Sequence, residues 1–494
     1  MNKWTTEARY QKLEDASADM LEALKAQVDA SPYRQTYHIQ PETGLLNDPN
    51  GLIYFKGQYY VSHQWFPLGP VHGLKYWYNY TSKDLVHFEP QGAILSPDTT
   101  FDSHGVYSGS AFEYEGALYV MYTGNHRTAN WERVPYQMIA KMTKDNTYEK
   151  FEHPVIEGAP DGYTAHFRDP KVFEYQGQLY ACIGAQNDAE EGRVLLYRAR
   201  TLTDWVFEGE LKTDLTAFGY MWECPDYFKL GDTDILLFSP QGIQPDGEKY
   251  RNIYQSGYVK GKLDVAQCEM THDAFEELDA GFDFYAPQTF EDEKGRRVLI
   301  GWMGLPEIDY PTDLDGWAHC LTIPRVLTME DGKLKQRPYP ALEKLRLNEE
   351  TALGYANKFV KQLYPYDGVQ YELNIDILEN EATALYFDLR TSKKHQTTII
   401  YDCKSQSITL DRSESGLLPE SVEDTRRTTY LDTPLSKLQI FVDTSSIEIF
   451  CNDGERVLTS RIFPEAEATG IRASTESGQV YLKFTKYALK GAQK

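Results

Sequence analysis

One pattern recurs five times between residues 44 and 302. Each repeat pairs two short runs of apolar residues around a turn glycine, and these glycines are Gly57, Gly116, Gly177, Gly231 and Gly295. Successive glycines lie 59, 61, 54 and 64 residues apart. Runs of Tyr, Phe, Val and Ile bounded by Gly, Asn, Asp and Pro are typical of β-strands and turns. A repeat of this length favours one four-stranded blade per repeat, so we expect a five-bladed β-propeller over residues 33–337.

The flanking segments lack this repeat. Residues 1–32 are expected to form a helical extension, because apolar residues between about 5 and 29 follow the spacing of an amphipathic helix. Pro338 and Pro340 predict an extended linker over residues 338–350, with a short helix near residues 340–347. Alternating apolar runs beyond it predict a β-sandwich over residues 351–494. We therefore expect an all-β chain with a short N-terminal helix.

Charge and composition exclude several classes of protein. The chain has 74 Asp and Glu against 50 Lys and Arg, a net charge of −24, so nucleic acid and anionic membranes are not expected partners. No apolar run approaches the roughly 20 residues that span a bilayer, and no secretory signal is apparent. The six cysteines form no ligand pattern. We expect a cytoplasmic protein without cofactor or metal; the sequence does not decide between monomer and homodimer.

The repeats bring acids together. Counting back eight or nine residues from each turn glycine gives Asp48, Ser108, Asp169, Glu223 and Ala286. If the repeats are equivalent blades, these five positions surround the central channel at one level. Carboxylates gathered in this way repel one another, so stability alone does not favour them. The ring of acids therefore indicates a functional site.

Two of these acids suit the cleavage of a glycosidic bond with retention. That reaction needs one carboxylate as nucleophile and one carboxylic acid as proton donor. Asp48 lies in NDPNG and is expected at a strand mouth, and Glu223 lies between an indole and a thiol, which would favour its protonated form. Asp169 follows Arg168 and suits stabilisation of positive charge in the transition state. Taken singly, NDPNG is an ordinary Asx turn and RDP an ordinary ion pair.

These residues carry a family resemblance. GLLNDPNG at 44–51, YSGS at 107–110, FRDP at 167–170, WECPD at 222–226, GWMG at 301–304 and the long run at 442–464 resemble family 32 of the glycoside hydrolases, the β-fructofuranosidases. The resemblance spans residues 38–464. It implies a five-bladed propeller followed by a β-sandwich. It also implies Asp48 as nucleophile, Glu223 as acid and base, and Asp169 as transition-state stabiliser.

Further site residues come from the same resemblance. The positions that match the family's fructosyl-binding residues are Asn47, Gln64, Tyr107, Ser108, Arg168 and Trp302. The chain departs from many secreted members in one place, because Val71-His72-Gly73 stands where they carry Trp-Gly-Asn. That sugar contact is therefore not carried over.

Within the family, the missing signal and HQWFPLGPVHGLKYW resemble the bacterial sucrose-6-phosphate hydrolases. This implies hydrolysis of sucrose 6-phosphate, and of sucrose, to fructose and glucose 6-phosphate or glucose. A chain at −24 binds a sugar phosphate only through local cations. The candidates for this role are His72, Lys75, Arg127 and Lys171.

Other functions remain open at this stage. Within enzymes they are an intracellular invertase, a fructo-oligosaccharide hydrolase, a fructosyltransferase and an arabinan-cleaving relative. A non-catalytic carbohydrate-binding propeller is an alternative of another class, against which the presence of all three acids counts. Release of reducing sugar from a panel of substrates separates these alternatives.

Overall fold

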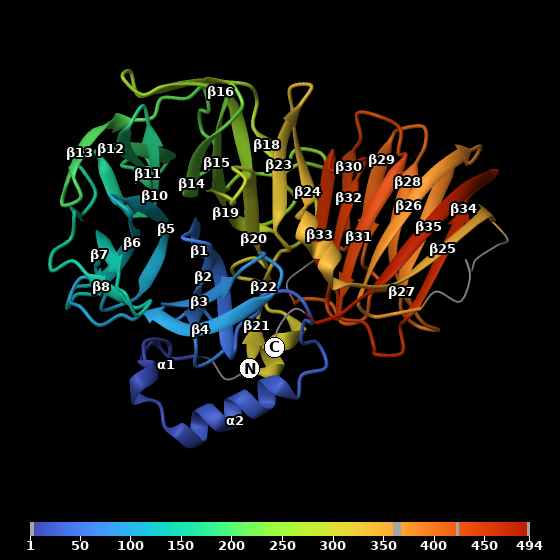
Figure 1. The fold of residues 1–494 in the computed structure, drawn as a ribbon, viewed down its shortest axis with the longest axis horizontal. Coiled ribbons are helices and arrows are strands. Elements are labelled where there is room, and N and C mark those ends of the chain that lie inside the picture. The colour runs from blue at the N-terminus through green and yellow to red at the C-terminus, as the bar shows by residue number, and fades with distance from the viewer. Residues whose placement is uncertain (1–3, 359–366, 421–423, 492–494) are drawn as a thin grey trace.

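The computed structural model describes residues 4–358, 367–420 and 424–491. The blue, green and yellow parts of the chain form five sheets, and the orange and red part forms two more sheets beside them (Figure 1). Helix α2 lies below the first group. Within the described residues, no helix is long and apolar enough to cross a membrane.

Each of the first five sheets has a path of four antiparallel strands that follow one another in the chain, except that two short strands intervene before the third strand of the fifth sheet. All but the third sheet also carry one extra short strand. The first contains β1 (Gly44–Phe55), β2 (Gln58–Phe66), β3 (Tyr76–Ser82) and β4 (Phe88–Leu95), with β21 (Trp317–Ala318) parallel to β1. The second contains β5 (Val106–Tyr114), β6 (Ala117–Arg127), β7 (Arg133–Met142) and β8 (Tyr148–Lys150), with β9 (Ile156–Glu157) on β7.

The remaining three sheets follow the same plan. The third contains β10 (Tyr163–Tyr175), β11 (Gln178–Asn187), β12 (Gly192–Thr201) and β13 (Asp204–Glu210). The fourth contains β14 (Met221–Leu230), β15 (Thr233–Gln241), β16 (Gly257–Asp264) and β17 (Glu269–His272), with β18 (Glu276–Glu277) on β16. The fifth contains β19 (Tyr285–Glu291), β20 (Arg297–Met303), β23 (Arg325–Glu330) and β24 (Lys333–Pro338), with β22 (Cys320–Leu321) on β20.

The first strands of the five sheets form a closed ring. β1 contacts β5, β5 contacts β10, β10 contacts β14, β14 contacts β19, and β19 returns to β1. The five repeat glycines all have positive φ, between 59° and 82°, and a side chain there would meet no atom within 4 Å. Backbone conformation in the turn, and not crowding, therefore explains why glycine recurs at these positions.

The C-terminal sandwich consists of two antiparallel sheets. One has the order β25 (Arg346–Asn357), β35 (Gln479–Leu489), β26 (Tyr371–Asn380), β31 (Lys437–Asp443), β32 (Ser446–Cys451) and β33 (Arg456–Arg461). The other has the order β30 (Arg426–Tyr430), β29 (Ser407–Asp411), β28 (Thr397–Asp402), β27 (Ala384–Thr391) and β34 (Gly470–Thr475). In β28, Thr397, Ile399 and Tyr401 are buried and their neighbours are not, the alternation of a strand with one face on the core. The predicted all-β class with a C-terminal sandwich is confirmed.

The N-terminal helix is shorter than its apolar spacing predicts. The structure has α1 (Thr6–Arg9), a 3-10 turn η1 (Leu13–Asp15) and α2 (Ala18–Asp29) in place of one continuous helix. Ser17 caps α2 by accepting from the Met20 amide, which requires extended backbone just before α2. The amide of Leu13 is held by the Tyr76 hydroxyl at 2.9 Å. Capping and this tertiary contact override the helical periodicity.

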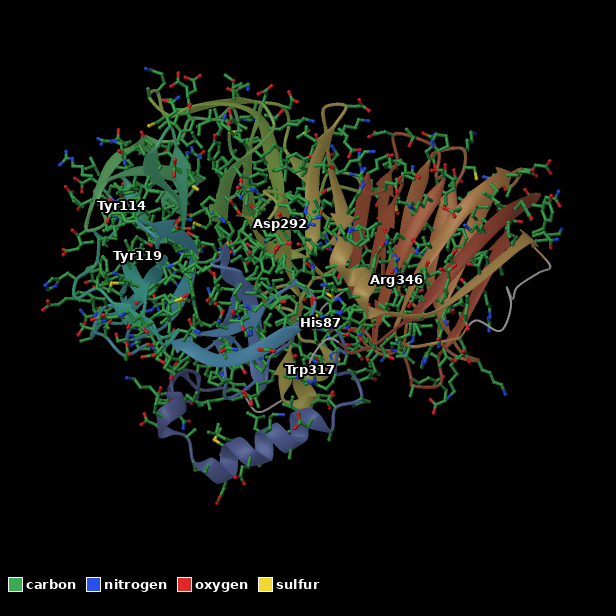
Figure 2. The ribbon with its side chains drawn as sticks, in the orientation of Figure 1. His87, Tyr114, Tyr119, Asp292, Trp317 and Arg346 are labelled. Atoms are coloured by element: carbon green, nitrogen blue, oxygen red, sulfur yellow. The ribbon has the colours of Figure 1, made fainter. Side chains whose placement is uncertain are left out.

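The junction between the two parts contains the short helix expected near residues 340–347, but a strand begins inside the segment expected as linker. A short 3-10 helix, η3 (Pro340–Leu345), follows β24, and β25 begins at Arg346, inside the segment 338–350. Arg346 pairs with Glu372 of the sandwich at 2.7 Å. In Figure 2 Arg346 lies at this junction, and Trp317 lies between the inner strands and α2. The domain limits stay a prediction.

Candidate active site

The five ring positions lie at irregularities of the inner strands. The register of β1 shifts between Leu46 and Pro49, and corresponding shifts occur in β5, β10, β14 and β19. Asp169, Cys224 and Ala286 have φ of 67°, 49° and 44°, a region that residues other than glycine rarely adopt. A β-bulge bends its strand and redirects the side chain that it carries. The bulges thus turn side chains of the ring positions into the central space.

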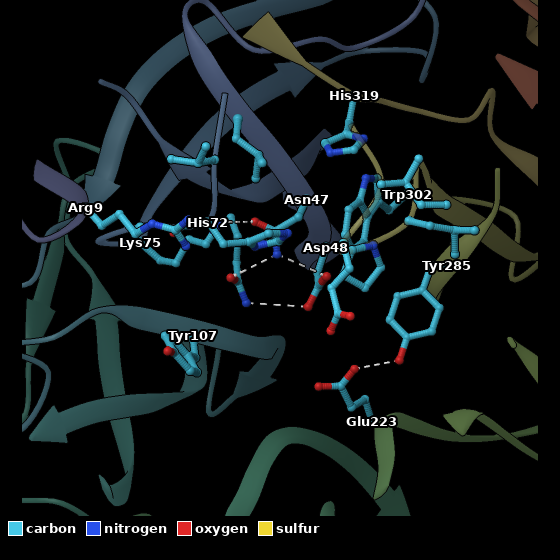
Figure 3. Close-up of a pocket in the computed structure, with 18 of the residues that line it drawn as sticks. Arg9, Asn47, Asp48, His72, Lys75, Tyr107, Glu223, Tyr285, Trp302 and His319 are labelled. Carbon is cyan, nitrogen blue, oxygen red and sulfur yellow. Dashed lines mark hydrogen bonds between the residues drawn. The ribbon is translucent and has the colours of Figure 1, made fainter. Parts of the chain in front are cut away.

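A cavity of about 540 Å³ opens at this level, and Asp48, Asp169 and Glu223 all line it. Figure 3 shows the carboxylates of Asp48 and Glu223 turned into the same open space, with Tyr285 and Trp302 on one side and Tyr107 on the other. The structure therefore brings together the three acids that the sequence predicts.

Asp48 is buried among hydrogen-bond donors. Its Oδ2 accepts from the Ser108 hydroxyl at 2.5 Å and from Gln64 Nε2 at 3.4 Å, and its Oδ1 accepts from Asn47 Nδ2 at 3.2 Å. Lys75 Nζ donates to Asn47 Oδ1 at 2.7 Å. Burial and then the Glu223 charge raise the pKa of Asp48, and the bonds from Ser108 and Asn47 oppose this rise. Three side chains thus fix the direction of this carboxylate, and Lys75 holds one of them, Asn47.

Glu223 is held by polar partners. Arg168 donates to its Oε1 from Nε at 2.9 Å and from Nη2 at 2.7 Å. Tyr285 and Gln241 donate to its Oε2 at 2.6 and 2.9 Å. The Trp222 indole, expected beside it, is turned away and stacks on another ring, because successive side chains of a strand point to opposite faces. The expected apolar surroundings of Glu223 are therefore wrong on the Trp222 side.

Asp169 lies beside the other two acids. Its Oδ2 accepts from the Cys224 amide at 3.0 Å, and Cys224 Sγ lies 3.6 Å from Asp169 Oδ2 and 3.7 Å from Asp48 Oδ2. Burial raises the pKa of Asp169 to about 7, with contributions from the Glu223 and Asp48 charges and an opposing one from Arg168. Cys224 thus contacts two of the three acids, a role that the sequence did not indicate.

The predicted fructosyl-binding residues converge on the same space. Those that line the cavity are Asn47, Gln64, Tyr107, Arg168 and Trp302. Ser108 lies just behind and contacts Asp48. The Trp302 ring packs edge-on against Tyr285 at 5.8 Å and His319 at 5.1 Å, and its buried Nε1 has no hydrogen-bond partner among the described residues.

Of the four candidate phosphate-binding cations, two line the cavity and two do not. His72 and Lys75 line the cavity, and burial lowers the pKa of His72 well below its usual value and that of Lys75 to about 7. Arg127 does not line it and bonds the Trp131 carbonyl. Lys171 is also absent from the lining, because its Nζ lies 3.2 Å from Asp226 and donates to a backbone carbonyl between two sheets. The Lys171 prediction is corrected accordingly.

Several lining residues have no counterpart in the predictions. They are Arg9, Tyr10, Arg133, His166, Gln241, Tyr285 and His319, among others. Tyr285 directly precedes the ring position Ala286, so the repeat itself could have indicated it. Arg133, His166 and Gln241 lie at the ends of β7, β10 and β15, and the others lie in the N-terminal extension or between short strands, where no motif marks them.

Comparison with known proteins agrees with this geometry. The model described as "Glycosyl hydrolases family 32 N-terminal domain" matches residues 38–338, and that described as "Glycosyl hydrolases family 32 C terminal" matches residues 341–489. The chain belongs to glycosyl hydrolase family 32. The resemblance seen in the motifs is thereby confirmed, and the two matches divide this family 32 chain between β24 and η3.

Curated relatives of this family 32 chain are similar over nearly their whole length. A sucrose-6-phosphate hydrolase from Staphylococcus xylosus is 66% identical over 491 residues, which cover 99% of each chain. One from Bacillus subtilis is 41% identical, with 92% of this chain and 94% of the relative covered. Among solved structures, a sucrose-6-phosphate hydrolase from Lactobacillus gasseri has a TM-score of 0.92 at 36% identity, covering 99% of this chain and 100% of that one. A Bombyx mori β-fructofuranosidase has a TM-score of 0.86 at 31% identity, covering 98% and 100%.

Proposed function

We propose that this chain is a retaining β-fructofuranosidase whose preferred substrate is sucrose 6-phosphate, which it hydrolyses to fructose and glucose 6-phosphate. The observation that carries the proposal is the convergence of Asp48, Asp169 and Glu223 on one cavity of a family 32 chain. The 66% identity to the Staphylococcus xylosus sucrose-6-phosphate hydrolase supports the substrate.

In the first step Asp48 attacks the anomeric carbon of the fructosyl ring. The bond from that carbon to the leaving oxygen breaks, and Glu223 donates its proton to this oxygen. A fructosyl ester of Asp48 forms. The bonds from Ser108 and Asn47 aim the Asp48 carboxylate and favour the ionised form that attack requires.

In the second step Glu223 takes a proton from water. The water oxygen bonds to the anomeric carbon, the ester bond to Asp48 breaks, and β-fructose leaves. Arg168 and Tyr285 hold the Glu223 carboxylate in one orientation for both proton transfers. Asp169 is placed to accept hydrogen bonds from sugar hydroxyls and to stabilise positive charge on the ring.

The substrate phosphate sits on the glucosyl 6-hydroxyl, and the reaction takes place in the cytoplasm, where phosphorylating uptake delivers such an ester. Of the candidate cations that line the cavity, Lys75 donates to Asn47, and burial lowers the pKa of both His72 and Lys75, which weakens their positive charge. The phosphate therefore needs other cations, which are considered below.

A substrate panel tests the proposal. We expect kcat/KM to be highest for sucrose 6-phosphate, lower by 10-fold or more for sucrose, and lowest for inulin and arabinan. Equal values for sucrose 6-phosphate and sucrose would instead identify an intracellular invertase. Binding of these sugars without release of fructose would identify a carbohydrate-binding protein.

A further inference from the structure

The cavity has walls of opposite charge. The segment between β20 and β22 contributes Glu307, Asp309 and Asp313. Glu307 accepts from the Tyr254 hydroxyl at 2.9 Å, and the Tyr254 ring packs against Tyr285, so this acidic wall lies on the Tyr285 side. Figure 3 shows Arg9 on the side away from Tyr285. An anionic group of the substrate is therefore repelled by one wall and attracted by the other.

Two arginines that line the cavity lack a carboxylate partner among the residues that the structure describes. Of the Lys and Arg side chains that line the cavity, Arg168 pairs with Glu223 and Lys75 bonds Asn47. Arg9 and Arg133 form no ion pair among the residues that the structure describes, although Asp and Glu outnumber Lys and Arg by 74 to 50. Arg9 is exposed at the rim, and Arg133 is half-buried with a buried Nε that has no hydrogen-bond partner in the described chain.

A neutral histidine fixes Arg133 without cancelling its charge. His166 Nδ1 lies 3.4 Å from Arg133 Nη1 and 3.0 Å from Arg168 Nη1. Burial, followed by the charges of Arg168 and Arg133, lowers the pKa of His166 to about 4, so the ring accepts from both guanidinium groups. Burial also lowers the pKa of Arg133, and the charges of Arg168 and Arg127 add to this effect. The charges that act on Arg133 are thus those of other arginines and not of a carboxylate, which suits this side chain to an anion.

The same contacts place Arg133 relative to the reacting bond. They run from Glu223 to Arg168, from Arg168 to His166, and from His166 to Arg133. Glu223 is the group proposed to protonate the leaving oxygen. These contacts therefore connect Arg133 with the group that is proposed to act on the leaving sugar.

The N-terminal segment around Arg9 packs against two loops beside the cavity. The Leu74 amide donates to the Arg9 carbonyl at 2.7 Å, and a Cβ at Gly73 would approach that carbonyl oxygen to 2.5 Å. The Tyr10 ring packs edge-on against Trp131 at 5.3 Å, two residues before Arg133. The segment thus connects the loop around Gly73 with the start of β7. Arg9 reaches the cavity because of these contacts.

We propose that Arg9 and Arg133 form a subsite that binds a phosphate monoester on the leaving group of the substrate, and that the N-terminal segment is therefore part of the substrate site. The proposal rests on the proposed function and names the residues that determine its substrate preference. Guanidinium groups bind phosphate oxygens through paired N–H donors, and each such charge-assisted contact changes affinity by about 10- to 100-fold.

The test is the ratio of kcat/KM for sucrose 6-phosphate to kcat/KM for sucrose. We expect this ratio to fall by about 10- to 100-fold in Arg9→Gln and in Arg133→Gln, through KM for the phosphate ester. Arg133→Lys retains part of the ratio, since it keeps the charge. Lys25→Gln is the matched control, because it removes an exposed charge of α2 that pairs with Asp29. It keeps the wild-type ratio.

The outcomes separate the two proposals. A wild-type ratio near one contradicts sucrose 6-phosphate as preferred substrate. A high ratio that both Arg9→Gln and Arg133→Gln retain contradicts the subsite. Thermal unfolding identifies a variant that has lost its fold; if Arg133→Gln is one, Arg9→Gln and Arg133→Lys decide. Inhibition of sucrose hydrolysis by inorganic phosphate gives a second readout, and it must weaken in Arg9→Gln and Arg133→Lys.

Discussion

Buried acids occur in two places in this chain with opposite surroundings. At the cavity, Asp48 and Asp169 lie near a third acid, and the pKa of each is raised. At the interface between the fifth sheet and the sandwich, Asp443 and Glu448 flank His38 at 2.8 and 3.0 Å. The pKa of both interface acids is lowered and that of His38 is raised to about 9, against an opposing effect of burial.

The difference is one of charge balance. Glu448 also meets Arg325 at 2.7 Å, so each interface acid has a cation of its own. In the cavity, Arg168 acts on Asp169 and Glu223 and Lys75 acts on Asp48, but burial lowers the pKa of Lys75 to about 7 and the acids repel one another. Breaking a buried ion pair is strongly destabilising, whereas relieving repulsion is not. The interface cluster thus serves stability, and the cavity cluster is explained by chemistry.

Asp48→Asn is expected to have the largest effect on activity. Without the nucleophile no fructosyl ester forms, so kcat falls by about 10⁴-fold or more on every substrate. The free energy of unfolding does not fall, since one of the mutually repelling charges is removed. Steady-state kinetics and urea unfolding measure the two quantities. A lower free energy of unfolding for Asp48→Asn would show that Asp48 stabilises the fold, as the interface acids do.

Glu223→Gln is expected to be milder and to depend on the substrate. Loss of the general acid lowers kcat on sucrose 6-phosphate by about 10²- to 10⁴-fold. An aryl β-fructofuranoside, whose leaving group needs no proton, loses much less in the formation of the ester. Burst kinetics on both substrates compare these losses. Equal losses would remove Glu223 from the role of acid.

Glu448→Gln is expected to act on stability alone. It leaves Arg325 and His38 with one carboxylate fewer, which lowers the free energy of unfolding by about 3 kcal/mol. The folded fraction keeps its wild-type kcat. Asp453→Asn, which removes an exposed acid paired with Lys437, is the matched control and changes stability little. A loss of kcat in folded Glu448→Gln would contradict the division between the two clusters.

The pH dependence of stability distinguishes the clusters in a smaller but independent way. The folded pKa of Asp169, about 7, lies above the usual 3.8, so its ionisation destabilises the fold as pH rises from 4 to 7. Asp169→Asn therefore gains stability relative to wild type over that interval. The folded pKa of His38, about 9, lies above 6.5. The stability lost in His38→Asn is greatest below pH 6.5 and shrinks as pH rises from 6.5 to 9, as unfolding at a series of pH values measures. If the stabilities of the two variants relative to wild type changed with pH in the same way, the distinction between the clusters would be contradicted.

Much of the architecture follows from the repeat. Five equivalent glycines predict five sheets, and counting back from them finds Asp48, Asp169 and Glu223, because equivalent strands place equivalent residues at one level of the ring. Alternation alone does not indicate the bulges at these positions. Adjacency in the sequence gives a wrong neighbour for Glu223, because Trp222 points to the opposite face of β14, and it does not show that Lys171 points between two sheets to Asp226.

Residues outside the repeat were harder to predict. Arg9 reaches the cavity because its carbonyl is held by the amide of Leu74 beside Gly73, 64 and 65 positions away along the chain. His166 precedes the FRDP motif, and nothing in its sequence context indicates that it lies between two arginines. Such contacts depend on how strand ends of different sheets and the N-terminal segment meet. They are set by the tertiary structure and leave no periodic signal.

The stereochemistry of the first product tests the central claim, that Asp48 and Glu223 act together as nucleophile and acid. Sucrose 6-phosphate is hydrolysed in buffer containing methanol, and the products are followed by NMR within the mutarotation time. Attack by Asp48 followed by attack of water or methanol predicts β-fructose and methyl β-fructofuranoside as first products. Initial release of the α-anomer, with no methyl β-fructofuranoside, would show a single displacement by water and would contradict the assignment.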